Sequence, residues 1–213
     1  MNSKKLFQLV IIVFICMALK PAILYKVIFV YDGDTVLLAN GEKIRYLGIN
    51  TPEINHENRK NEFMSIAARN FNRKLVNSKK VKLEFDQELK DRYGRILAYV
   101  YLKNGQMVNL LLLRKGMAYV LFSRFKLKYM KSFLDNQQKA MQEKSGIWRR
   151  PLAVTEKYYL GNRRSFRFHR PDCPLGRKIS HKNRIIFKSP YDAFWKGLSP
   201  CKRCNPCEWQ RLN

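Results

Sequence analysis

The sequence is poor in acidic residues: 16 Asp and Glu stand against 42 Lys and Arg in 213 residues, a formal net charge of +26. This charge exceeds what solubility requires and predicts a polyanionic partner, for which nucleic acid is favoured over an anionic membrane surface. The hydrophobic content of 46% is enough for a folded core, so a disordered chain is excluded. We expect DNA and/or RNA as the partner, no protein partner, and a monomer.

Long hydrophobic runs, internal repeats and low-complexity stretches are also lacking. The longest uncharged run, Leu6 to Leu19, follows two lysines and is shorter than the ~20 residues that a membrane-spanning helix needs. Residues 1–23 therefore resemble a signal peptide with a possible cleavage site after Ala18. An uncleaved anchor extended through Leu24 stays open. Either way, we expect an exported protein, periplasmic or secreted.

The order of the expected elements indicates one barrel domain and a small appendage. Strand periodicity and Asp-Gly or Asn-Gly turns predict strands at Leu24–Tyr31, Thr35–Ala39, Lys43–Ile49, Val81–Phe85 and Ile96–Tyr101. Helical periodicity predicts helices at Phe63–Leu75 with Asn61 as a cap, Met107–Arg114 ending at Gly116, and Tyr129–Lys144 ending at Gly146. The fold class is mainly β with α (α+β): a five-stranded barrel of the oligonucleotide-binding type with three helices in residues 24–150. A linker at 151–157 and a small module at 158–213 follow.

The few carboxylates of the first domain occur beside arginines. Asp32 and Asp34 flank a turn that, taken alone, is more often structural than functional. The picture changes with Arg45 and Glu53, which enclose several potential oxygen ligands, and with the arginine-rich segment Asp91–Arg95. Phosphodiester hydrolysis needs this inventory: a cation, a base for water, and fixed donors such as arginine. Hard oxygen ligands without nearby His or Cys indicate calcium or magnesium, and millimolar extracellular calcium fits an exported enzyme.

Three spaced motifs carry a resemblance to a known family. They are Asp32-Gly33-Asp34-Thr35, the segment Arg45 through Thr51-Pro52-Glu53, and Asp91-Arg92-Tyr93-Gly94-Arg95 with Ala98-Tyr99, joined by Met107-Val108-Asn109 and Ile147-Trp148. On these motifs, residues 24–150 resemble the staphylococcal nuclease (thermonuclease) family. The resemblance implies a calcium-dependent endonuclease for DNA and/or RNA, with one calcium ion and products that end in 3′-phosphate.

The same resemblance implies a role for each matching residue. Asp34 and the Thr51 carbonyl would bind calcium, with Asp32 in support. Glu53 would orient or deprotonate water. Arg45 and Arg95 would stabilise the transition state, and Arg95 would also favour departure of the 5′-oxygen.

This chain departs from the family pattern in two places. Asn50 replaces a second calcium-binding aspartate; its amide oxygen can coordinate, but one negative charge is gone, so we expect weaker metal binding. Phe122 and Arg124 stand where the family usually has two tyrosines beside the nucleotide. Phe122 either stacks on a base or lies in the core, and Arg124 is a candidate phosphate contact, as is Arg92.

A second set of motifs lies in the C-terminal segment. His169-x-x-x-Cys173 and Cys201-x-x-Cys204 have the spacing of a zinc site, in which four ligands stabilise a domain too small for a large core. Cys207 is either a spare thiol or a replacement for His169. Disulfide pairing is the alternative, because an exported protein meets oxidising conditions.

Residues 158–207 resemble the metal-binding domain of Ada-type methylation-repair proteins, through Gly161-Asn162-Arg163-Arg164, His169 to Cys173 and Pro200 to Cys204. The ligands in that family are cysteines, and His169 stands where one is expected. The resemblance implies a zinc-ribbon-like α/β module and no repair chemistry. Basic residues of this segment are either phosphate contacts or a generic basic surface: Arg163, Arg164, Arg167, Arg170, Lys202 and Arg203.

Three functions stay open: a nuclease with a tail that increases residence on nucleic acid, a non-catalytic nucleic-acid-binding barrel, and a protein whose tail is the working part. The second is disfavoured because degeneration usually removes charged site residues, and these are present here. Among the remaining aromatic residues, Trp148 is expected to be a packing anchor, and Tyr93 and Tyr99 are expected in the core.

Overall fold

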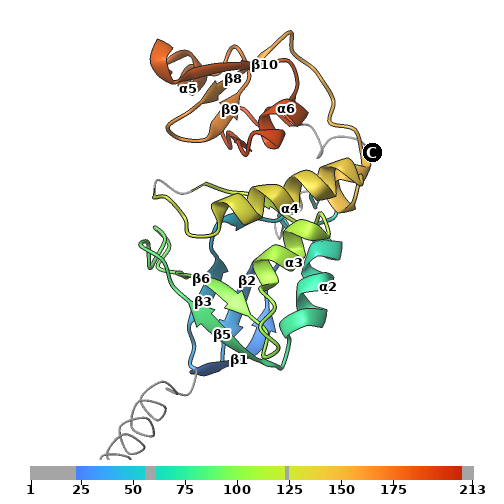
Figure 1. Ribbon diagram of the computed structural model, residues 1–213, viewed down its shortest axis with the longest axis vertical. Coiled ribbons are helices and arrows are strands. Elements are labelled where there is room, and N and C mark those ends of the chain that lie inside the picture. Colours follow the sequence, from blue (N-terminus) through green and yellow to red (C-terminus); the bar gives the residue numbers. More distant parts are fainter. Residues whose placement is uncertain (1–22, 56–60, 123–124, 208–213) are drawn as a thin grey trace, which may run out of the picture.

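The structure is a computed structural model that describes residues 23–55, 61–122 and 125–207. It contains a closed five-stranded barrel, followed by a smaller four-stranded sheet. Figure 1 shows helix α4 (Met130–Gln142) between the barrel and the smaller sheet. The predicted signal peptide or anchor lies outside the described residues, apart from the last residue of its predicted range. No helix within the described ranges is long and apolar enough to cross a membrane.

The barrel confirms the expected fold. Its strands are β1 (Leu24–Val30), β2 (Thr35–Leu38), β3 (Lys43–Tyr46), β5 (Lys80–Glu84) and β6 (Ile96–Tyr101). They lie in the order β1-β2-β3-β6-β5, and β1 pairs with β5 to close the barrel. The pairing of β3 with β6 is parallel, with Ile44 opposite Ile96, so both strands enter the sheet from the same end. That end carries Arg95, immediately before β6.

The helices agree with the expected ones to within a few residues, with one error. They are α2 (Ser65–Val76), α3 (Val108–Arg114) and α4. The prediction that Asn61 caps the first helix is wrong, because α2 begins after Met64, which has a left-handed φ of 68° and no side-chain cap bond. The Asn61 amide oxygen instead accepts a hydrogen bond from the backbone N–H of Asn55, which fixes the loop before the helix.

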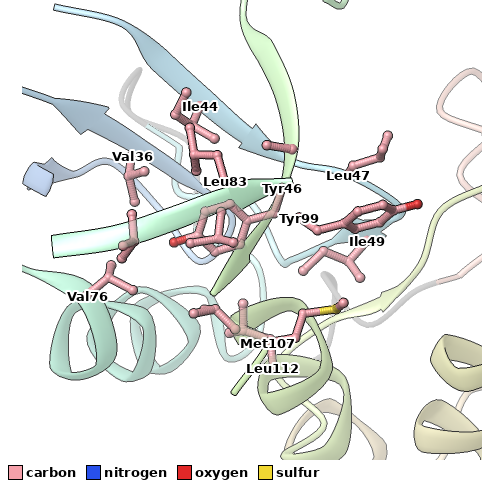
Figure 2. Packing of buried hydrophobic residues seen from close by; sticks show 14 of the residues in the cluster. Val36, Ile44, Tyr46, Leu47, Ile49, Val76, Leu83, Tyr99, Met107 and Leu112 are labelled. Atoms are coloured by element: carbon pink, nitrogen blue, oxygen red, sulfur yellow. The ribbon is translucent and has the colours of Figure 1, made fainter. Parts of the chain in front are cut away.

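The barrel core is built around two fully buried tyrosines. Tyr46 and Tyr99 lie among the aliphatic side chains shown in Figure 2. The Tyr46 hydroxyl donates to Asn72 Oδ1 on α2 at 2.9 Å, and Asn72 Nδ2 donates to the Asp32 carbonyl at 3.2 Å. The core thereby fixes the turn between β1 and β2, where the predicted carboxylates lie.

The C-terminal segment forms a sheet of its own. Its order is β10-β8-β9-β11, made of β8 (Tyr159–Asn162), β9 (Arg167–His169), β10 (Arg184–Phe187) and β11 (Ser199–Pro200). Two short helices, α5 (Pro174–Arg177) and α6 (Pro190–Trp195), accompany the strands, with 3-10 turns at Gly146–Arg149 and His181–Asn183. Residues 151–158, which include the predicted linker, contain no helix or strand. We call residues 159–207 the C-terminal module.

The C-terminal module docks on the barrel domain through α6. Gln137 on α4 is fully buried: its Oε1 accepts from the Val120 N–H at 2.6 Å and its Nε2 donates to the Phe194 carbonyl at 2.6 Å. The prediction that Trp148 is a packing anchor is confirmed, because its ring packs edge to face against Phe194 with the centroids 5.2 Å apart. Val120 belongs to β7 (Tyr119–Val120), which pairs with β4 (Ile49–Asn50) beside the barrel. The barrel domain and the C-terminal module are therefore joined both by a buried hydrogen bond and by packed aromatic rings.

Candidate active site

A cleft of about 770 Å³ lies where the barrel faces the C-terminal module. The barrel side of its lining carries predicted site residues from all three motifs: Asp32, Asp34, Arg45, Asn50, Glu53, Arg92 and Arg95. The facing side is lined by the module, including Asn162, Ser165, Arg167, His169, Cys201, Lys202 and Arg203. The structure thus brings together residues that are far apart in the sequence, and it adds a wall that the barrel motifs alone do not predict.

Asp34 lies at the centre of the barrel side. It is 4% exposed, and its Oδ2 accepts from the Thr51 N–H at 2.8 Å, from Thr51 Oγ1 at 3.1 Å and from Arg45 Nη2 at 3.0 Å. Arg45 stands on β3 opposite Thr35, because β2 and β3 pair antiparallel directly after the Asp34 turn. Its Nη1 donates to the carbonyls of Tyr46 and Ile49 at 2.8 Å each. The guanidinium is therefore held in one position by the backbone.

Asp32 and Asp34 form a carboxylate pair. The Asp34 N–H donates to Asp32 Oδ1 at 2.8 Å, and the intervening Gly33 has no room for a side chain, since a Cβ there would lie 2.6 Å from Thr51 Cγ2. Burial and the neighbouring Asp34 charge raise the pKa of Asp32 to about 7. Two crowded, partly buried carboxylates repel each other unless a cation or a proton joins them. This donor set fits a hard divalent cation.

Asn50 and Thr51 lie beside this pair and contact each other. Asn50 Oδ1 accepts from Arg45 Nη2 at 2.8 Å, while its Nδ2 donates to the Thr51 carbonyl at 2.9 Å and to the Tyr119 hydroxyl at 3.0 Å. A carbonyl or amide oxygen has two lone pairs, so each oxygen keeps one acceptor site beyond these bonds. The assignment of both residues as metal ligands stays a prediction.

Glu53 and Arg95 line the same cleft from two different loops. The Glu53 side chain is 47% exposed. The Glu53 backbone N–H donates to Glu62 Oε2 at 3.0 Å, and the Glu53 carbonyl accepts from the Glu62 N–H at 3.1 Å. Burial raises the pKa of Glu62. Sequence reasoning missed Glu62 because no motif contains it. Arg95 is held by Asp91, whose Oδ2 accepts from Nε at 2.8 Å and from Nη2 at 2.7 Å.

The prediction for Tyr93 is wrong, whereas that for Tyr99 is confirmed. Tyr99 is fully buried, but Tyr93 is 67% exposed and lines the cleft. Tyr93 lies in a turn in which the Gly94 N–H donates to the Asp91 carbonyl and Gly94 has a left-handed φ of +77°. This turn makes the Tyr93 ring project from the barrel. The guanidinium carbons of Arg92 and Arg95 lie 4.7 and 5.4 Å from the ring centroid. Arg92 is exposed, in keeping with a contact to nucleic acid.

Phe122 contacts the C-terminal module. Its half-buried ring stacks on Phe166 from the turn between β8 and β9, with centroids 3.8 Å apart and an interplanar angle of 8°. A Cβ on Gly197 would lie 2.9 Å from Phe122 Cε2, which explains glycine there. Phe122 therefore seals the edge of the cleft. Arg124 lies outside the described residues.

A second constellation lies in the module. The ligand atoms of His169, Cys173, Cys201 and Cys204 all lie within 4.8 Å of one another, and Cys173 Sγ is 3.4 Å from His169 Nδ1. None of the cysteines at 173, 201, 204 and 207 forms a disulfide bond, so the disulfide alternative is not formed. Cys207 lies in the apolar core instead, which selects His169 as the fourth member of the cluster.

The protonation of His169 and Cys173 suits a divalent metal, whereas burial and the neighbouring Cys173 and Cys201 raise the pKa of Cys204 to about 12. Burial and the Arg167 charge lower the pKa of His169, which favours the neutral imidazole that binds metals. Burial opposes ionisation of Cys173, but hydrogen bonds from the backbone N–H groups of Gly176 and Leu175 lower the pKa of its thiol. Three thiols and one imidazole in a compact, mostly buried group are donors of the types that structural zinc sites use.

The basic residues of the module separate into three groups. Arg170 is structural, because its Nη1 pairs with Glu156 at 2.7 Å and its Nε donates to the Cys204 carbonyl at 3.1 Å. Arg163 and Arg164 are exposed on the turn between β8 and β9 and do not line the cleft described above. The cleft-lining group is Arg167, Lys202 and Arg203.

Comparison with known proteins gives matches for both parts of the chain. Residues 43–150 match the model of the staphylococcal nuclease homologue family, and residues 146–207 match that of the metal binding domain of Ada. The chain is 38% identical to a thermonuclease of Staphylococcus hyicus over 127 residues, which are 58% of this chain and 75% of that protein. It is 38% identical to the endonuclease YncB of Bacillus subtilis over 135 residues, 61% of this chain and 64% of that protein. The SPbeta prophage-derived endonuclease YokF of the same bacterium is also 38% identical over 135 residues, with 45% of its length covered.

Proposed function

Because the chain belongs to the staphylococcal nuclease homologue family, we propose that it is a nuclease that hydrolyses phosphodiester bonds of DNA and/or RNA in the cleft described above. One observation carries this proposal: a single cleft gathers a carboxylate pair, a third carboxylate and two fixed arginines. This is the inventory that phosphodiester hydrolysis requires. The cationic character of the whole chain, +26, fits a polyanionic substrate.

We propose calcium as the metal of this site, held by Asp34 and Asp32 with oxygens of Asn50 and Thr51. The support is chemical: the donors are hard oxygens, and burial raises the pKa of Asp32 beside Asp34, so a divalent cation relieves the repulsion within the pair. When bound, such an ion supplies positive charge to the phosphate and lowers the barrier to attack by water. We propose zinc for the cluster in the C-terminal module, where it would act as a structural ion.

The side chains divide the remaining chemistry. Glu53 is exposed to the cleft and orients or deprotonates the attacking water. Arg45 and Arg95 supply fixed positive charge where negative charge develops on the phosphate oxygens. Arg95 also assists departure of the 5′-oxygen, so the products end in 3′-phosphate. Neither arginine needs to reorganise much, because backbone carbonyls hold Arg45 and Asp91 holds Arg95.

The test is digestion of DNA and RNA by the whole chain, in calcium and in a calcium-selective chelator, beside two variants. Arg95→Ala removes a cleft arginine and is expected to lower the rate by about 10²–10³-fold, as loss of one transition-state donor does. Arg73→Ala removes an exposed arginine from the last turn of α2 and is the matched control. Product ends are read by polymerase extension before and after phosphatase treatment, since a 3′-phosphate blocks extension. Equal digestion with and without calcium, or equal rates for the two variants, contradicts the proposal.

A further inference from the structure

We propose that the C-terminal module is the second wall of the nuclease cleft and that Arg167, Lys202 and Arg203 on it form a binding subsite for the phosphodiester backbone of the substrate strand. This inference rests on the proposed nuclease function and adds a part of the site that neither family match assigns. It turns the module from a tethered tail into a fixed component of the substrate site.

The module is held against the barrel at two places. On the α4 side, Gln137 and Gln138 donate to the carbonyls of Phe194 and Trp195, at 2.6 and 2.8 Å. At the cleft edge, Phe122 stacks on Phe166 with rings 3.8 Å apart. A stacked aromatic pair and a buried amide bridge fix an orientation as well as a contact, because both are directional. The wall is therefore preorganised.

Arg167 is a half-buried cation in the lining of the cleft. Within residues 23–55, 61–122 and 125–207, it has no carboxylate partner: its Nη1 donates to Ser199 Oγ at 2.9 Å and to the Pro200 carbonyl at 3.3 Å. Its half-buried position means that water solvates its positive charge only in part. A desolvated guanidinium that faces a cleft is stabilised by an anion, and the planar fork of arginine suits a phosphate.

Lys202 and Arg203 extend this positive wall towards the proposed catalytic base. Both are exposed, and Lys202 Nζ lies 3.8 Å from Glu53 Oε1 with 76% of its side chain accessible. An exposed ion pair of this length is weak, so it leaves Lys202 available for a phosphate. Both residues lie in the loop between Cys201 and Cys204. The Asn205 N–H donates to the Cys201 carbonyl at 2.9 Å and closes this loop. Their backbone positions are thereby fixed.

The opposite wall completes the pattern that single strands require. Tyr93, 67% exposed on the barrel side, offers a ring face for a base, while the module offers cations for the backbone. Proteins that bind single strands combine a positive groove with aromatic stacking platforms in this way. The phosphates that reach the module are those next to the scissile one, because Lys202 lies beside Glu53.

The experiment compares two double variants of the whole chain that lose the same charge. Lys202→Gln with Arg203→Gln removes two cations from the cleft wall, and Arg163→Gln with Arg164→Gln removes two exposed cations of the same module that lie outside the cleft lining. Binding of a labelled single-stranded oligonucleotide is measured by fluorescence anisotropy at several salt concentrations, without added calcium so that the strand stays intact. Melting temperatures confirm that both proteins are folded.

The slope of log affinity against log salt is negative, and each lost phosphate contact reduces its magnitude by about 0.7 for a single strand. We expect the magnitude of the slope to be smaller by about 1.4 for the Lys202/Arg203 variant and to match the parent for the Arg163/Arg164 variant. A magnitude that falls equally in both variants, or in neither, overturns the inference. Failure of the proposed function has a different readout, which is the absence of calcium-dependent cleavage by the parent protein.

Discussion

Replacement of Gln137 by methionine tests whether the C-terminal module and the barrel form one unit. Gln137 is the buried amide that accepts from the Val120 N–H and donates to the Phe194 carbonyl, both at 2.6 Å. Methionine keeps the volume and removes both bonds. Each buried backbone group left without a partner costs about 1–3 kcal/mol, so Gln137→Met is expected to cost about 2–6 kcal/mol in total. About 1–3 kcal/mol of this, for the Phe194 carbonyl, falls on the contact between the module and the barrel, because the Val120 bond lies within the barrel domain.

The neighbouring Gln138 provides the matched control. It makes one such bond, to the Trp195 carbonyl at 2.8 Å, from a half-buried position where water can replace it. Gln138→Met is therefore expected to cost about 0.5–1.5 kcal/mol, the net value of an ordinary hydrogen bond.

The assay is urea unfolding followed by tryptophan fluorescence, because Trp148 and Trp195 lie in or beside the contact between the two parts. We expect Gln137→Met to lower the midpoint of the transition that separates the module from the barrel about twice as much as Gln138→Met does. Equal, small losses in the two variants would refute the reasoning, because they would mean that the amide bridge does not hold the module in place.

Three further predictions follow from the site. Asn50→Asp restores a carboxylate beside the proposed calcium; unit charges 4 Å apart interact by about 4 kcal/mol at an effective dielectric of 20, and even after offset by water the calcium concentration for half-maximal cleavage should fall. A calcium titration that coincides with the parent's contradicts this. Gly33→Ala places a Cβ 2.6 Å from Thr51 Cγ2. It should lower the cleavage rate strongly and the melting temperature only slightly, both measured on one preparation. Cys201→Ser removes one of four closely spaced ligands and should abolish stoichiometric zinc, measured by metal analysis, and lower the melting temperature of the module; unchanged zinc content would show that the cluster is not the site.

The sequence predicts well what depends on local pattern. The barrel strands follow from alternation and from turns that contain glycine, and the helices follow from a period near four residues. The carboxylates and arginines of the cleft could be identified because the three motifs are short and each lies at a strand end. The barrel topology then brings Asp34, Arg45 and Arg95 to one face.

Features that depend on contacts between distant segments could not be predicted. Tyr93 was expected in the core because aromatic residues are usually buried, but its turn holds it away from the barrel. The stacking of Phe122 on Phe166 joins positions 44 residues apart, and no local sequence pattern predicts this contact. The same holds for Lys202 near Glu53, which makes the module part of the cleft.

The most direct test of the central claim is the single-turnover rate at which Glu53→Gln cleaves a labelled single strand in saturating calcium. Glutamine keeps the size of the side chain and its place in the cleft but cannot accept a proton from water. Loss of a general base lowers a rate by about 10²–10⁴-fold, and we expect a loss in this range with strand binding retained. Glu143→Gln, an exposed change at the end of α4, is the control and should cleave like the parent. If Glu53→Gln cleaves as fast as the parent, the cleft does not work as described.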